Sequence, residues 1–146
     1  MNNIKIVLDT NVLLVSISSR SKYHWFFQEL LSGSFVLVIT TEILLEYEEI
    51  LKRRFNIAVA ENVIRALLQL PNVIHQHVYF NWRLIGNDPD DNKFVDAYVA
   101  GNANLLVTND RHFDVLRQVD YPPVEVVSID VFKLLIRGLL DIPIVS

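Results

Sequence analysis

Short apolar runs recur along the chain, and each is bounded by polar or turn-forming residues. They are rich in β-branched side chains, as buried parallel strands are. We therefore expect each run to form one strand of a common sheet, with the weakest signal in the run that contains two histidines. The runs cover residues 4–8, 35–39, 73–80, 105–107 and 124–129.

Segments with helical periodicity lie between these runs. Thr41 and Asp130 each follow a strand-like run and are the predicted N-caps of their helices. The alternation of strand and helix predicts an α/β fold, a three-layer sandwich in which a central parallel sheet of about five strands is flanked by helices. The predicted helices cover residues 23–31, 41–55, 60–70, 91–103 and 130–140.

Two of the apolar runs end in an acid. Asp9 directly follows the run 4–8 and precedes Thr10 and Asn11, and Asp110 closes the same kind of pattern after the run 105–107. A lone aspartate after a strand often only caps a turn. Open α/β sheets, however, bind their ligands at the carboxyl ends of strands. If the two strands are adjacent, both acids project into one crevice.

Glu46 lies inside the predicted helix 41–55. The ordinary role of a glutamate there is a solvated face with helical charge pairs, and Glu48 and Glu49 each have a cation four residues further on. Glu46 has no such helical cation. This leaves it as a candidate ligand carboxylate.

A cluster of acids precedes the predicted helix 91–103. One interpretation is that this cluster is only an acidic helix start, which the helix dipole favours. Asp96 lies five residues after Asp91, so the two point about 140° apart on a helix and cannot face one site. We expect Asp91 to be the ligand, Asp88 to be an accessory acid, and Asp96 to face solvent or pair along the helix.

Composition restricts the chemistry of such a site. The chain has no cysteine, so any metal is held by oxygen or imidazole. Neighbouring carboxylates raise one another's pKa, so four of them need a cation to stay ionised together. Hard oxygen ligands favour Mg²⁺ or Mn²⁺ over zinc. We expect none of the histidines to be a ligand, because His75 and His77 lack a third partner and His24 and His112 are isolated.

Length and charge set broader limits. With 146 residues, 51% of them hydrophobic, the chain is expected to form one domain over residues 1–146. No apolar stretch is long enough to span a membrane and no secretory signal is evident, so we expect a cytoplasmic protein. The net charge of −4 is weak evidence against a nucleic-acid partner, since a bound cation reverses the local charge.

These motifs, in this order, resemble the PIN-domain ribonucleases over nearly the whole chain, and most of all the small bacterial and archaeal branch of toxin components. The resemblance rests on Val7-Leu8-Asp9-Thr10-Asn11-Val12, on Glu46 within a helix, on Asp88-Pro89-Asp90-Asp91-Asn92-Lys93-Phe94, and on Leu106-Val107-Thr108-Asn109-Asp110. The choice among Asp88, Asp90 and Asp91 depends on the register of that loop.

The resemblance implies a PIN-like fold, Mg²⁺ or Mn²⁺ as cofactor, and cleavage of single-stranded RNA. It further implies a small antitoxin as partner and a homodimer. The implied catalytic metal ligands are Asp9, Glu46, Asp91 and Asp110, and the supporting residues are Asn11 and Thr108, with Asp114 as a further acid. Lys93 and Arg111 are candidate contacts to the substrate backbone, although a basic residue at such a place is more often only solvated.

Two other functions remain open at this stage. A non-catalytic PIN domain would bind RNA or protein and use its acids only to hold an ion. A receiver-like or phosphatase-like domain would use Asp9 as a phosphoryl acceptor. The latter needs a lysine after a late strand, and the run 124–129 is followed by Asp130 instead.

Overall fold

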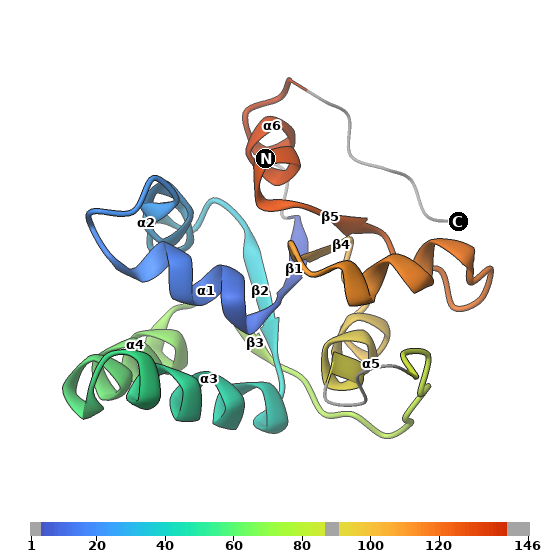
Figure 1. Ribbon diagram of the computed structural model, residues 1–146, viewed down its shortest axis with the longest axis horizontal. Helices are drawn as coiled ribbons and strands as arrows, with labels where there is room; N and C mark the ends of the chain where they lie inside the picture. The colour runs from blue at the N-terminus through green and yellow to red at the C-terminus, as the bar shows by residue number, and fades with distance from the viewer. Residues whose placement is uncertain (1–3, 87–90, 140–146) are drawn as a thin grey trace.

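A five-stranded parallel sheet forms the centre of the computed structural model, which describes residues 4–86 and 91–139 (Figure 1). Every neighbouring pair of strands is parallel. The strand order is β3-β2-β1-β4-β5, so the chain starts in the middle of the sheet and builds outward in both directions. The strands are β1 (Lys5–Leu8), β2 (Val36–Ile39), β3 (Val73–His75), β4 (Leu105–Val107) and β5 (Val126–Val127).

Helices cover both faces of this sheet, which confirms the predicted sandwich. In Figure 1, α1 to α4 lie on one side of the sheet, and α5 and a 3-10 helix lie on the other. After β3 the chain returns to the centre of the sheet and adds β4 on the other side of β1. Right-handed crossovers then place the following helices on the opposite face. The helices are α1 (Thr10–Ile17), α2 (His24–Ser32), α3 (Thr41–Arg54), α4 (Ile57–Gln69), α5 (Asn92–Ala100), α6 (Ile129–Ile136) and the 3-10 helix η2 (Arg111–Gln118).

The core is a hydrophobic cluster that includes residues of β1, β2, β4 and β5, and the partly buried Val73 of β3 packs against it. At one end of the molecule it is closed by three buried aromatic rings, Phe26 of α2, Phe35 before β2 and Phe132 of α6. Their centroids lie 5.1 to 5.5 Å apart. This contact ties the last helix to the first half of the chain.

Two helical segments were not predicted. Helix α1 begins directly after Asp9 and is buried at most positions, so it shows no amphipathic period. The 3-10 helix η2 has about three residues per turn, so a search for a 3.6-residue period does not detect it. Conversely, the run 73–80 is a strand only over Val73–His75, and the run 124–129 only over Val126–Val127.

Both predicted N-caps were wrong by one or two residues. Thr40, not Thr41, accepts the backbone N–H of Ile43 at the start of α3. Ser128, not Asp130, accepts the N–H of Val131 at the start of α6. In each case the last residue before the helix has the extended backbone that a cap requires.

Within residues 4–86 and 91–139, every helix is too short or too polar to cross a bilayer.

Candidate metal centre

Asp9 is a buried carboxylate at the carboxyl end of β1. Its residue is only 4% exposed, and its Oδ2 accepts a 2.8 Å hydrogen bond from the Thr108 hydroxyl. Burial raises the pKa of Asp9 to about 6; the bond from Thr108 opposes this rise, and the charges of Asp110 and Glu46 add to it. Asp9 is therefore a desolvated acid inside a field of other acids.

The Tyr47 hydroxyl fixes the backbone just before Asp9. This side chain of α3 is fully buried and donates a 2.5 Å hydrogen bond to the carbonyl of Leu8. The Asp9 N–H donates to the carbonyl of Val107 in β4, at 3.1 Å. Both contacts hold the strand end against its neighbours, so the carboxylate stands on a rigid support.

Thr108 connects the two strand ends. Its hydroxyl donates to Asp9 and at the same time accepts the N–H of Asp110, at 3.0 Å. A hydroxyl has one donor and two acceptor sites, so a single side chain satisfies both. Thr108 is itself buried. The predicted supporting role of Thr108 agrees with these contacts.

A second part of the site is formed by Asp91, Asp110 and His112. One ligand atom from each residue lies within 4.8 Å of the others. The Nδ1 atom of His112 lies 3.5 Å from Oδ1 of Asp110 and 3.7 Å from Oδ2 of Asp91. Asp110 also caps η2, because its Oδ1 accepts the N–H of His112 at 2.9 Å. Two carboxylates and one imidazole form a donor set that suits Mn²⁺ well and Mg²⁺ through the carboxylates.

Glu46 reaches the same edge of the sheet from α3. Its Oε2 accepts a hydrogen bond from the Thr10 hydroxyl, and its Oε1 lies 2.7 Å from Nζ of Lys93 in α5. The sequence has no basic residue at helical spacing from Glu46, so it predicted an unpaired carboxylate. That prediction was wrong, because Glu46 pairs with Lys93. The partner comes from a different helix, which sequence periodicity cannot detect.

The structure thus brings the four predicted acids to one edge of the sheet. Asp9 and Asp110 follow the adjacent strands β1 and β4. Asp91 immediately precedes α5, and Glu46 lies on α3. The charges of Asp110 and Glu46 both act on Asp9. Among the described residues, the ligand atoms that lie within 4.8 Å of one another are those of Asp91, Asp110 and His112, with Asp9 and Glu46 beside this group.

The remaining predicted residues are spread around this edge. Asn11 is exposed on the first turn of α1 and lines a pocket of about 280 Å³ together with Asp110. Asp114 lies on η2 and faces Arg117, 3.6 Å away. Arg111 is exposed at the start of the same helix. Asp88 and Asp90 lie outside the described residues.

Two residues differ from the predictions. Asp96 does not face solvent: it is 5% exposed and its Oδ1 accepts the N–H of Trp82 at 2.8 Å. Burial raises its pKa, opposed by the Trp82 hydrogen bond. His112 was expected to be isolated, yet it lies with Asp91 and Asp110, which makes it a candidate ligand. Its position two residues after an N-cap acid is the one sequence signal that could have suggested this.

A family model described as a PIN domain matches residues 5–112. The chain belongs to the PIN-domain family. All four acids of the site, as well as Thr108 and His112, lie inside the matched range. No curated protein matches the chain.

Solved structures share the fold of this PIN domain at low identity. VapBC2 of Rickettsia felis, bound to a DNA fragment from its promoter, has 19% identity and a TM-score of 0.59, covering 86% of this chain and 98% of that chain. VapC20 of Mycobacterium tuberculosis, a toxin that cleaves the sarcin-ricin loop, has 16% identity and a TM-score of 0.57, covering 75% and 92%. The PIN-domain endonuclease Utp24 has 14% identity and a TM-score of 0.52, covering 86% and 85%.

Proposed function

We propose that this PIN domain is a metal-dependent endoribonuclease that hydrolyses phosphodiester bonds of single-stranded RNA. The observation that carries the proposal is the convergence of Asp9, Glu46, Asp91 and Asp110 at one sheet edge, with Asp9 buried and oriented by Thr108. Carboxylates gathered in this way are costly to the fold unless a cation neutralises them. Family membership supports a nuclease.

In this proposal the four acids hold Mg²⁺ or Mn²⁺. The bound ion would supply an acidified water and neutralise charge on the phosphate oxygens. Thr108 keeps Asp9 in one orientation, and Tyr47 keeps the strand end that carries Asp9 in place. Lys93 holds Glu46, and its ammonium group is near enough to the acids to meet a substrate phosphate as well. Arg111 stands exposed beside Asp110 for the same purpose.

We further propose that the protein is the toxin of a toxin–antitoxin pair. Two of the structural neighbours support this, because one is a VapBC complex and the other is named as a toxin that cleaves the sarcin-ricin loop. The proposed partner is a small antitoxin protein, the proposed assembly is a homodimer, and the proposed compartment is the cytoplasm. We also propose that residues 1–146 form one PIN domain, which the single hydrophobic cluster supports.

The test is a cleavage assay with purified protein, a single-stranded RNA and Mn²⁺. EDTA and Asp9→Asn should each abolish cleavage, whereas Asp120→Asn should leave it intact, because Asp120 is an exposed aspartate outside the site. RNA binding and Mn²⁺ binding without cleavage would instead support the non-catalytic binding module. Failure to bind either Mn²⁺ or Mg²⁺ would disprove the proposed metal centre.

A further inference from the structure

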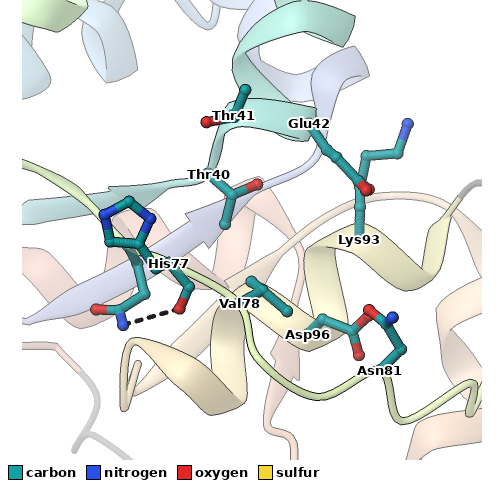
Figure 2. A pocket seen from close by; sticks show the side chains of 9 residues that line it. Thr40, Thr41, Glu42, His77, Val78, Asn81, Lys93 and Asp96 are labelled. Atoms are coloured by element: carbon teal, nitrogen blue, oxygen red, sulfur yellow. Dashed lines mark hydrogen bonds between the residues drawn. The ribbon is translucent and has the colours of Figure 1, made fainter.

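A polar hollow lies beside the metal centre, between the start of α3, the extended segment 76–86 and α5 (Figure 2). We name it the Asp96 pocket, after the acid at its base; Glu42, His77, Asn81 and Lys93 line it with Asp96. Its volume is about 290 Å³, at the lower end of the range for small-molecule sites. A neighbouring hollow of about 530 Å³ shares Glu42, Asn81, Lys93 and Asp96 and opens the pocket toward Arg83.

Asp96 is the unusual group of this pocket, because an aspartate is rarely buried on a helix. Figure 2 shows it reaching from α5 toward Asn81 of the segment 76–86. One of its oxygens accepts the N–H of Trp82. A carboxylate accepts about four hydrogen bonds, so this contact leaves acceptor capacity for a ligand. The proposed metal centre makes no use of this acid.

The pocket is continuous with the metal centre through Lys93. This side chain lines the Asp96 pocket, and its Nζ atom lies 2.7 Å from Glu46. Lys93 and Glu42 also line the hollow that opens over Glu46 itself. Lys93 thus belongs both to the lining of the Asp96 pocket and to the surroundings of Glu46, so we expect an RNA strand bound at the metal centre to lie near the pocket.

The segment 76–86 also offers aromatic surface to such a strand. Tyr79 is 90% exposed, and Phe80 is exposed next to it. The ring of Trp82 packs edge-on against Phe80, with centroids 4.8 Å apart, and against Tyr121, with centroids 5.8 Å apart. Exposed aromatic rings along an extended segment are the surfaces on which unpaired bases stack.

We propose that the Asp96 pocket binds one base of the substrate strand and that this base is guanine. The inference rests on the proposed ribonuclease function. The pocket holds two acids, Glu42 and Asp96, against one lysine, so it disfavours a phosphate and favours a group rich in N–H donors. Guanine presents two adjacent donors, N1–H and N2–H, which one carboxylate accepts together. Uracil presents a single N–H between two carbonyl oxygens, which the carboxylate repels.

The first experiment measures base preference without metal and without cleavage. Guanosine, adenosine, cytidine and uridine are titrated separately into the full-length protein in EDTA, and binding is followed by ¹⁵N NMR at the Asn81 side-chain amide and the Trp82 backbone amide. We expect guanosine to bind about 10-fold more tightly than uridine, as loss of a charge-assisted hydrogen bond would predict. Equal shifts for all four nucleosides, or tighter binding of adenosine or cytidine, would overturn the proposal.

The decisive variant is Asp96→Asn. It keeps an oxygen for the Trp82 N–H but replaces one acceptor by a donor, so the preference for guanosine should disappear while the melting temperature is maintained. Glu61→Gln, an exposed acid on α4, is the matched control and should retain the preference. If Asp96→Asn does not fold, Asn81→Leu replaces it, because Asn81 is exposed and its loss leaves the core intact.

Further cleavage and NMR experiments distinguish failure of this inference from failure of the nuclease proposal. Mn²⁺-dependent cleavage of a mixed-sequence RNA that persists in Asp96→Asn, but no longer occurs next to guanosine, supports both proposals. Metal-dependent cleavage with no guanosine dependence in the unmodified protein overturns the pocket alone. Stronger NMR shifts with arginine amide than with guanosine would assign the pocket to a protein side chain and also overturn it.

Discussion

The ends of β1 and β4 lie side by side in the sheet, but they hold their acids in different ways. Asp9 follows β1 directly, is 4% exposed, and is held by Thr108. The Asp110 side chain is 27% exposed, caps a 3-10 helix and faces an imidazole. The first acid is thus a rigid, desolvated group, and the second is a hydrated group on a helix start.

The difference follows from where each acid stands relative to its strand. Asp9 is the residue after Leu8, so it is still covered by α3 and β4. Asp110 comes three residues after Val107, when the chain has already left the sheet. A buried acid provides a fixed reference for a bound ion, whereas a partly exposed acid can adjust more to ion and substrate. The two strand ends therefore make separable contributions to one site.

Replacement of Asp9 should have the largest effect. We expect Asp9→Asn to reduce Mn²⁺ affinity by more than about 100-fold, beyond the range typical for residues that only support a ligand. In EDTA the same change should raise the melting temperature, because a neutral amide avoids the cost of a buried carboxylate and still accepts the Thr108 hydrogen bond. Calorimetric titration and thermal unfolding measure the two effects. A stable protein with unchanged Mn²⁺ affinity would contradict the assignment of Asp9.

Removal of the Thr108 hydroxyl should loosen both strand ends at once. Thr108→Val deletes the bond to Asp9 and the bond from the Asp110 N–H. We expect Mn²⁺ affinity to fall by about 10- to 100-fold and the free energy of unfolding to fall by about 1 to 3 kcal/mol. Thr108→Ser restores the hydroxyl and should recover most of the affinity. A serine variant as impaired as the valine variant would show that packing, not the hydroxyl, matters.

Substitution of Asp110 should separate its charge from its cap. Asp110→Asn keeps an oxygen for the His112 N–H, so the free energy of unfolding should stay unchanged while Mn²⁺ affinity falls. Asp110→Ala should additionally cost about 1 kcal/mol, the usual value of an N-cap. Urea unfolding of the two variants side by side measures this difference. Equal stability of both would mean that the cap contributes nothing.

The smallest effect is expected at His112, which is half exposed. His112→Ala should weaken Mn²⁺ binding by less than about 10-fold and Mg²⁺ binding hardly at all, because imidazole suits Mn²⁺ better than Mg²⁺. Titration of both ions into the same variant tests this. A larger loss for Mg²⁺ than for Mn²⁺ would argue that His112 acts on Asp91 and Asp110 rather than on the ion.

The sequence predicted the parallel sheet well, because strands depend on local pattern; the role of the acids at its edge stays a prediction. Strand runs that end in an acid predict a carboxyl-edge site without any knowledge of packing, and β1 and β4 are indeed neighbours. Helix α1 was missed because burial on most sides removes the amphipathic period. The predicted bounds of β3 and β5 were too wide, because the apolar pattern there extends beyond the residues that form strand hydrogen bonds.

Contacts between distant elements could not be predicted from the sequence. The partner of Glu46 is 47 residues away, on α5. Asp96 was expected at the surface because helical geometry turns it away from Asp91. In the structure that direction leads into a second pocket, which the segment 76–86 lines. His112 lacked a sequence partner because its neighbours, Asp91 and Asp110, come from two different elements. Each of these contacts can be recognised only once the tertiary structure is known.

The central claim is that the acids at this sheet edge bind a divalent ion, and anomalous diffraction from a crystal grown with Mn²⁺ tests it most directly. We expect an anomalous peak at the four acids Asp9, Glu46, Asp91 and Asp110. The same crystal form of Asp9→Asn should lose that peak or show it greatly weakened. A peak elsewhere on the molecule, or no peak at saturating Mn²⁺, would contradict the account.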